Sequence, residues 1–145
     1  MLIKLDLITS NLDPLPYTCF TNYNNIISPA IYWTPVWNTK SYALTVVDID
    51  TNNLVHWLVT YIPSAITYLA PGANNEYPLI QGPNQKGIND FLPFCPSYGS
   101  GTHRYKFTVY ALDNFLHNHI NIQSFYRRIS GHVLDSASII YTLSH

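Results

Sequence analysis

The sequence predicts a single, mainly β domain, and three features support this fold class. The chain has 145 residues, enough for one domain with a substantial core. It is 47% hydrophobic and 14% aromatic, with twelve Tyr and ten Pro, which favours strands separated by irregular turns over helical bundles. Several segments alternate apolar and polar side chains with the period of a half-buried strand. We therefore expect a β-rich sandwich that spans residues 1–145.

The N-terminal half contains most of the predicted strands. Alternation, or a short extended pattern, marks five of them: Met1–Leu7, Ala30–Trp33, Tyr42–Asp50, Leu54–Ile62 and Thr67–Ala70. The segment from Asn11 to Pro35 around the second strand is rich in Asn, Pro, Tyr and Ser, which predicts a long irregular excursion. A short polar turn joins the third and fourth strands, as in an antiparallel hairpin. Pro63 is expected to end the fourth strand, because proline cannot donate to a ladder.

The C-terminal half begins with a long segment that is interrupted by Pro and Gly, from Ala73 to Gly101. Loops of this length are uncommon in a compact domain unless they serve a site, and this one leads directly to a strand at His103–Asp113. Apolar residues then recur at three- and four-residue spacing from Ile122 to Leu134, which predicts an amphipathic helix with Asn121 as its N-cap and Gly131 in its interior. A final strand is expected at Ser138–Leu143.

Polar side chains gather where these strands end. His103 and Tyr105 share one face of their strand, because side chains alternate, and they stand at the end of an otherwise apolar row. The predicted hairpin brings Asp48 and Asp50 next to His56, and alternation places Trp57 on the face opposite His56. Taken alone, the pair His103 and Tyr105 also fits a hydrogen-bonded core. Two acids and a histidine at the adjacent hairpin favour a pocket.

The residues of this cluster suit an anion site. Imidazoles near a carboxylate retain protons and donate hydrogen bonds to phosphoryl oxygens, and Tyr105 adds a donor. Backbone N–H groups of the loop Cys95–Gly101 provide further donors. Asp48 is expected to orient a histidine rather than to touch the anion. Arg104 lies on the opposite face, where an ion pair with Asp50 is the simplest role.

Composition argues against several classes of protein. The net charge of −1 and the pI near 6.6 argue against a basic surface that would bind nucleic acid. The N-terminus does not resemble a signal peptide, and no apolar run approaches the length of a transmembrane helix, so we expect a cytoplasmic protein with at most peripheral membrane contact. Cys19 and Cys95 lack metal-finger spacing, and free thiols are favoured over a single bridge. No cofactor is indicated.

Ordered motifs along nearly the whole chain resemble the phosphatidylethanolamine-binding protein family, especially its short bacterial and archaeal, Raf kinase inhibitor-like branch. These motifs are Tyr17-Thr18-Cys19, Ile27-Ser28-Pro29, Thr39-Lys40-Ser41-Tyr42, Asp48-Ile49-Asp50, His56-Trp57, Gly87-Ile88-Asn89-Asp90-Phe91, Cys95-Pro96, His103-Arg104-Tyr105, Tyr110-Ala111-Leu112-Asp113 and Gly131-His132-Val133-Leu134. The order and spacing are more specific than any single motif. The resemblance implies two antiparallel sheets with one or two peripheral helices.

The resemblance also implies a pocket for phosphate, phosphorylated ligands or similar anions. By position, the ligand-binding residues are Asp48, His56, His103 and Tyr105, with Cys95, Pro96 and Ser97 as the pocket wall, and Asp50 and Arg104 in support. Two departures stand out. The family's Asp-Pro-Asp-Ala-Pro motif reads Asp48-Ile49-Asp50-Thr51-Asn52, without either proline, and Ser97 replaces a proline of the wall.

Three functions are consistent with this sequence. The first is non-catalytic binding of a small anion, a phosphoethanolamine-type headgroup or a phosphorylated residue. The second is regulation of a protein partner, such as inhibition of a kinase or serine protease, as the resemblance allows. The third uses Asp48, His56 and His103 as a metal triad or an acid–base pair of a hydrolase. The first is the principal hypothesis, with no metal and no turnover expected, as a monomer or homodimer.

Overall fold

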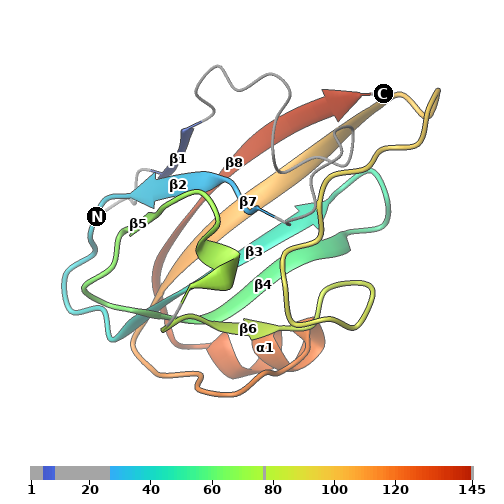
Figure 1. The fold of residues 1–145 in the computed structure, drawn as a ribbon. Helices are drawn as coiled ribbons and strands as arrows, with labels where there is room; N and C mark the ends of the chain where they lie inside the picture. The colour runs from blue at the N-terminus through green and yellow to red at the C-terminus, as the bar shows by residue number, and fades with distance from the viewer. Residues whose placement is uncertain (1–4, 9–26, 77, 145) are drawn as a thin grey trace.

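Two antiparallel sheets make up most of the molecule (Figure 1). The computed structural model describes residues 5–8, 27–76 and 78–144. A three-stranded sheet has the order β1 (Leu5–Ile8), β2 (Ala30–Trp33) and β5 (Tyr68–Leu69). A five-stranded sheet has the order β6 (Ile80–Gly82), β4 (Leu54–Pro63), β3 (Ser41–Asp48), β7 (Thr102–Leu112) and β8 (Val133–Ser144). The predicted mainly β fold with two antiparallel sheets is confirmed.

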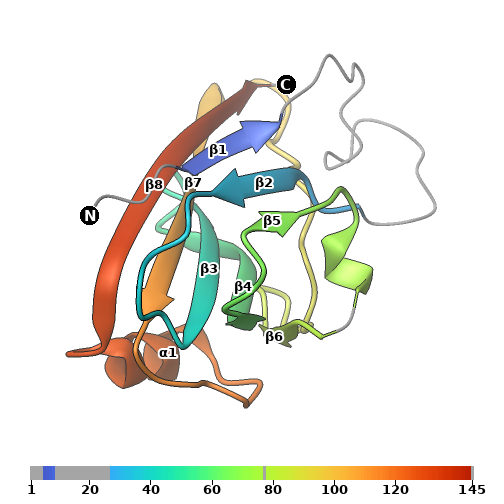
Figure 2. The same ribbon diagram turned by 90° about the vertical axis from the view of Figure 1, so that its left-hand side faces the viewer.

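The two sheets pack face to face and cross steeply, as Figure 2 shows. Between them lies the larger apolar core, to which the central strands contribute one face each. Its members include Leu44, Val46, Trp57, Val59 and Phe107, all fully buried. The other face of β3 and β4 carries a second apolar cluster, which the helix α1 (Ile122–Ile129) covers with Phe125 and Ile129. Both faces of the central strands are therefore occupied.

Most predicted strands form, with boundaries shifted by a few residues. The part of Met1–Leu7 that the structure describes is in β1, at an edge as expected, and the excursion from residue 11 to 26 lies outside the described residues. β6 was not predicted, because it is only three residues long and follows a proline. Its Gly82 is required by close packing, since a Cβ there would lie 2.3 Å from the Ile120 carbonyl oxygen. A short 3₁₀ turn, η1, spans Ala73–Asn75.

The helix ends earlier than its hydrophobic spacing predicts. Asn121 is its N-cap, and its side-chain oxygen accepts from the Ser124 N–H at 2.8 Å. The prediction was wrong at the other end, because Gly131 adopts a φ of 80° and terminates the helix instead of lying inside it. Val133 and Leu134 therefore begin β8. His132 lies in the connection, with its Nδ1 2.7 Å from Asp113 Oδ1.

None of the helices among the described residues is long and apolar enough to cross a membrane.

Candidate functional site

A cavity of about 300 Å³ opens at the end of β3, β4 and β7 where the polar residues were expected. Its lining combines the hairpin turn, the loop before β7 and the first residues of β7. The lining residues are Asp48, Thr51, Leu54, His56, Lys86, Leu92, Pro93, Cys95, Pro96, Ser97, His103 and Tyr105. All seven ligand-binding residues that the sequence indicated therefore lie on one cavity. Whether they bind a ligand stays a prediction.

The turn between β3 and β4 is held by hydrogen bonds in place of the two absent prolines. The Asp48 carboxylate accepts from the Asp50 N–H at 3.0 Å and from the Thr51 hydroxyl at 2.7 Å. Asn52 and Asn53 have φ values of 49° and 57°, and the Leu54 N–H donates to the Thr51 carbonyl, which is the pattern of a type I′ turn. Asparagine tolerates this left-handed backbone better than most residues. The turn thus fixes Asp48 without proline.

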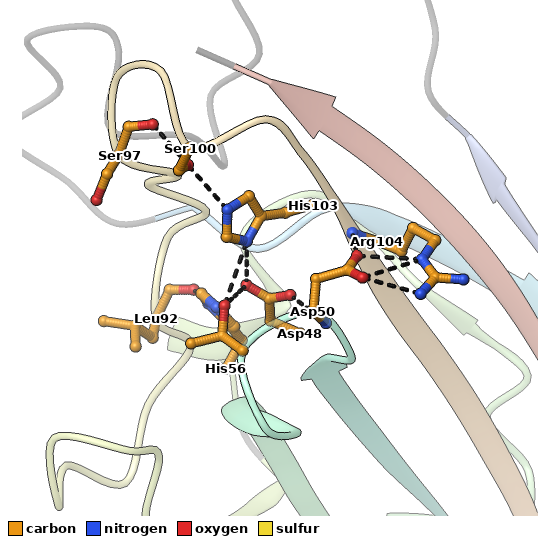
Figure 3. A network of polar contacts seen from close by, with 9 residues as sticks. Asp48, Asp50, His56, Leu92, Ser97, Ser100, His103 and Arg104 are labelled. Atoms are coloured by element: carbon orange, nitrogen blue, oxygen red, sulfur yellow. Dashed lines mark hydrogen bonds and ion pairs between the residues drawn. The ribbon is translucent and has the colours of Figure 1, made fainter.

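His103 is held between oxygen atoms on both sides of its ring (Figure 3). Its Nδ1 lies 2.7 Å from Asp48 Oδ2, and its Nε2 lies 2.9 Å from Ser100 Oγ. The Ser100 hydroxyl donates its proton to the Ser97 carbonyl at 2.6 Å. Contacts at both ring nitrogens thus fix the orientation of the His103 ring. Asp48 orients His103, as the sequence suggested.

His56 reaches the cavity through a β-bulge. Val55 pairs with Val47 and Trp57 pairs with Val46, so His56 is an extra residue in β4. The predicted placement of Trp57 opposite His56 was wrong for this reason. Trp57 is buried in the core between the sheets, and the His56 ring packs edge-on against Phe94 and Tyr105 with 5.1 Å between ring centres. The bulge lets two neighbouring residues face inward.

The protonation of His56 follows from its surroundings. Burial lowers the pKa of its imidazole below the ordinary value of 6.5, while the Leu92 carbonyl and Asp48 oppose this effect. The ring is therefore neutral at pH 7. Its Nδ1 lies 2.8 Å from the Leu92 carbonyl oxygen, which can only accept, so Nδ1 carries the proton. Nε2 is left as a hydrogen-bond acceptor.

Tyr105 supplies a neutral hydroxyl. Its ring stacks on Phe94 with 4.0 Å between ring centres and is 1% exposed. Burial, with the nearby Asp48 charge, raises the pKa of Tyr105 far above its ordinary value. Within the part of the chain that the structure describes, its hydroxyl makes no hydrogen bond. Tyr105 is thus a donor without an internal acceptor on the cavity wall.

Arg104 and Asp50 form a separate pair on the far side of the turn. The Arg104 guanidinium contacts both Asp50 carboxylate oxygens, with Nη2 at 2.8 Å from Oδ1, and its backbone N–H donates to Oδ2 at 2.7 Å. These hydrogen bonds lower the pKa of Asp50. Asp50 therefore ties the turn to β7 and does not line the cavity, which agrees with its expected supporting role.

Three polar residues of the site were not found from the sequence. Lys86 lies in a turn where the Asn84 side chain accepts from the Lys86 N–H at 2.9 Å, and it brings a cation to the cavity rim. Thr51 contacts both Asp48 and His103. Ser100 contacts His103 from the Gly-rich loop. The pattern Asn84-Gln85-Lys86-Gly87 was the available signal for a turn, but nothing in it indicated where Lys86 would lie.

The cavity wall also corrects the expectation of free thiols. Cys95 is disulfide-bonded, and no cysteine among the described residues is free. Cys19 lies outside the described residues. Covalent attachment at Cys95 restrains the wall segment Cys95-Pro96-Ser97 from one end.

The metal triad that the sequence left open as an alternative does not form among the described residues. His56 directs Nδ1 at a carbonyl oxygen, and His103 directs Nδ1 at Asp48. In residues 5–8, 27–76 and 78–144, no group of three or more His, Cys, Asp or Glu side chains is arranged to hold a metal ion.

Sequence comparisons show which known proteins this chain is similar to. A family model described as phosphatidylethanolamine-binding protein matches residues 9–144. A UPF0098 protein of Methanothermobacter thermautotrophicus is 34% identical over 136 residues, which cover 88% of this chain and 87% of that protein. YbcL of Escherichia coli strain K12 is 38% identical over 95 residues, which cover 59% of this chain and 52% of YbcL. That match therefore spans about half of YbcL.

Solved structures agree with the sequence comparisons. CT736 of Chlamydia trachomatis, described as a phosphatidylethanolamine-binding protein homologue, superposes with a TM-score of 0.75 at 28% identity, over 82% of each chain. The YbcL structure, described as a member of the mammalian family, gives a TM-score of 0.73 at 28% identity, over 82% of this chain and 80% of YbcL. The expected resemblance is confirmed, and the chain belongs to the phosphatidylethanolamine-binding protein family.

Proposed function

We propose that this protein binds small phosphorylated or similar anionic ligands in the cavity, without transforming them. The observation that supports this most directly is the His103 ring, which Asp48 orients beside the Tyr105 hydroxyl and the Lys86 cation. Two donors and a cation facing one small volume match the oxygens of a phosphate group. Inorganic phosphate, a phosphoethanolamine-type headgroup and a phosphorylated residue share this chemistry.

The Ser100 hydroxyl occupies the position that a ligand oxygen takes. It contacts His103 Nε2 at 2.9 Å from an exposed loop, between Gly99 and Gly101, which both have positive φ. A phosphoryl oxygen is a stronger acceptor than a hydroxyl and replaces it at Nε2. Ser100 then competes with the ligand for His103.

His56 selects the protonated form of the ligand. Its Nε2 is an acceptor, so a fully ionised phosphate oxygen placed there would face a lone pair. A phosphate monoanion carries one P–OH group that donates to this nitrogen. Binding of the dianion requires a proton on His56, and affinity therefore rises as the pH falls.

The direction of the hydrogen bonds at Ser100 supports binding over catalysis. Asp48, His103 and Ser100 follow the order of a hydrolase triad, in which the serine donates to the histidine. Here the serine proton is directed at the Ser97 carbonyl instead. His103 is in turn a donor to Ser100 and not its base.

Titration with inorganic phosphate and with O-phosphoethanolamine, followed by NMR of the histidine rings, tests this function. Both ligands should shift the His103 and His56 ring signals with saturation below about 10 mM. His103→Ala and Tyr105→Phe should weaken binding about tenfold, from loss of a charge-assisted or buried donor, and Ser100→Ala should strengthen it. His132→Ala, which removes an exposed imidazole outside the cavity, should have no effect. Absence of saturation with both ligands would refute the proposal.

A fluorophosphonate probe tests the claim that no turnover occurs. Such probes label serines whose hydroxyl is activated by a histidine. We expect no adduct at Ser100 in the intact protein. A mapped adduct at Ser100 that disappears in His103→Ala would instead establish a nucleophilic serine.

A further inference from the structure

A second cavity lies on the opposite face of the central strands. Its volume is about 410 Å³, within the range of roughly 300–1,000 Å³ that is common for sites of small molecules. The floor is the outer face of β3 and β7, at the end that α1 leaves uncovered. One wall is the first turn and a half of α1, with Gln123 and Tyr126, and the other is the hairpin turn with Asn52 and Asn53.

The lining has a distinct chemistry from that of the anion cavity. Hydroxyl and amide groups predominate: Thr45, Thr108, Tyr110, Tyr126, Asn52, Asn53 and Gln123. The lining includes no carboxylate, imidazole or thiol, and Lys106 is its one charged residue. Hydroxyls and amides both donate and accept hydrogen bonds, as the hydroxyls of a polyol do. The cavity therefore complements a neutral, hydroxyl-rich molecule better than an ion.

The floor includes two buried hydroxyl groups. Thr45 is 2% exposed and Thr108 is 8% exposed, although their neighbours on this face are apolar. Thr108 Oγ1 lies 2.8 Å from Ser138 Oγ. Burial raises the pKa of Tyr110 to about 12, so this hydroxyl remains protonated. The hydroxyls of Thr45, Thr108 and Tyr110 give the floor groups that both donate and accept hydrogen bonds.

An aromatic wall completes the arrangement. Tyr126 is 45% exposed, and its ring lines the cavity beside the hydroxyl floor. The neighbouring Phe125 ring, buried in the cluster beneath α1, is tilted against it with 5.6 Å between ring centres. An aromatic ring next to hydrogen-bonding groups suits a molecule with one C–H face and a hydroxylated rim. Sugar rings have this form.

We propose that the cavity between α1 and the β3–β4 turn is a binding site for a neutral saccharide unit. The site is separate from the anion cavity, and the β3–β4 turn lies between the two cavities with different residues facing each. Along the turn, Asp48, Thr51 and Leu54 face the anion cavity, whereas Val47, Asn52, Asn53 and Val55 face the saccharide cavity. The proposal does not depend on the anion site, because the two linings have no residue in common.

Amide NMR with a panel of neutral sugars tests the site. Glucose, galactose, N-acetylglucosamine, maltose and cellobiose are titrated up to about 10 mM, with inorganic phosphate as comparison. At least one sugar should shift the amide signals of Thr45, Thr108 and Gln123 with saturation, while the His103 ring signals remain in place. Tyr126→Ala and Gln123→Ala should each raise the dissociation constant about tenfold or more.

Tyr68→Ala is the matched control, since Tyr68 is 48% exposed on β5 and lines neither cavity. Its dissociation constant should equal that of the unmodified protein. Far-UV circular dichroism confirms that each variant is folded. The proposal is overturned if no sugar produces saturable shifts at these amides, if phosphate alone does so, or if Tyr126→Ala and Tyr68→Ala behave alike.

Discussion

Asp48 and His103 meet across the neighbouring strands β3 and β7, with 2.7 Å between Oδ2 and Nδ1 and with only 6% and 14% of their side chains exposed. Asp113 and His132 form a contact of the same length, yet their side chains are 42% and 47% exposed. The same pair of groups thus occurs once buried and once in solvent. This contrast supplies an internal control for the energetics of the site.

Replacement of Asp48 by Asn should destabilise the protein by about 2 kcal/mol, because it disturbs bonds to His103, Thr51 and the Asp50 N–H in a buried place. Asp113→Asn should change the free energy of unfolding by less than about 0.5 kcal/mol, since exposed pairs contribute little. Urea denaturation of both variants measures the difference. Equal effects would show that burial does not strengthen the Asp48–His103 contact.

Acid should destabilise the protein through His56. The pKa of this group is lower in the folded than in the unfolded state, chiefly because of burial, so the unfolded state binds the proton more readily. The stabilising contribution of neutral His56 is complete above pH 6.5, the ordinary pKa of the group in the unfolded state, and it is lost as the pH falls below that pKa. His56→Asn retains a donor for the Leu92 carbonyl but does not titrate.

Melting temperatures measured by thermal unfolding between pH 7.5 and pH 5, in buffer free of phosphate, test this role of His56. The decrease in melting temperature should be smaller in His56→Asn than in the unmodified protein. Parallel curves would assign the acid sensitivity to other groups.

The β3–β4 turn should not tolerate a proline at position 52. Asn52 has a φ of 49°, which the proline ring cannot adopt, so Asn52→Pro should cost about 3 kcal/mol or more. Asn52→Gly should be close to neutral, because glycine adopts this backbone freely. Chemical denaturation compares the two. A stable Asn52→Pro variant would mean that the turn can change its geometry.

Cys95 should resist alkylation in the native protein. It is disulfide-bonded, so iodoacetamide should modify it only after reduction in denaturant, as peptide mass mapping would show. Modification of Cys95 without reductant would contradict this. A disulfide at Cys95 is more typical of an oxidising compartment than of the cytoplasm that we expected from the sequence.

The sequence predicted those parts of the fold that depend on a regular period. β3, β4 and β7 form as predicted over eight to eleven residues, and β3 is buried along its whole length because both of its faces are covered. The end of the helix was missed because the apolar spacing continues through Gly131 into β8, and only the backbone angle of Gly131 separates them. For the site, spacing and resemblance placed Asp48, His103 and Tyr105 correctly around one cavity.

Other features of the site depend on tertiary contacts that no local pattern encodes. Lys86 reaches the cavity because the segment from Gly82 to Phe94 folds back over the strand that bears His56. Ser100 meets His103 where Gly99 and Gly101, on either side of Ser100, bend the loop. The second cavity lies between the first residues of α1 and the hairpin turn, two segments whose proximity the hydrophobic pattern did not indicate.

Because His56 is the extra residue in β4, the anion cavity contains this imidazole only when β4 has its present length. In a regular antiparallel pair, the residue before Trp57 would face away from the core between the sheets. A chain with one residue fewer in β4 at this point would therefore keep Trp57 in the core but have no histidine in the cavity. A single-codon deletion would therefore remove the His56 imidazole from the cavity while the other cavity residues kept their places in the sequence. The length of β4 at this position matters to the cavity as much as the identity of the residue.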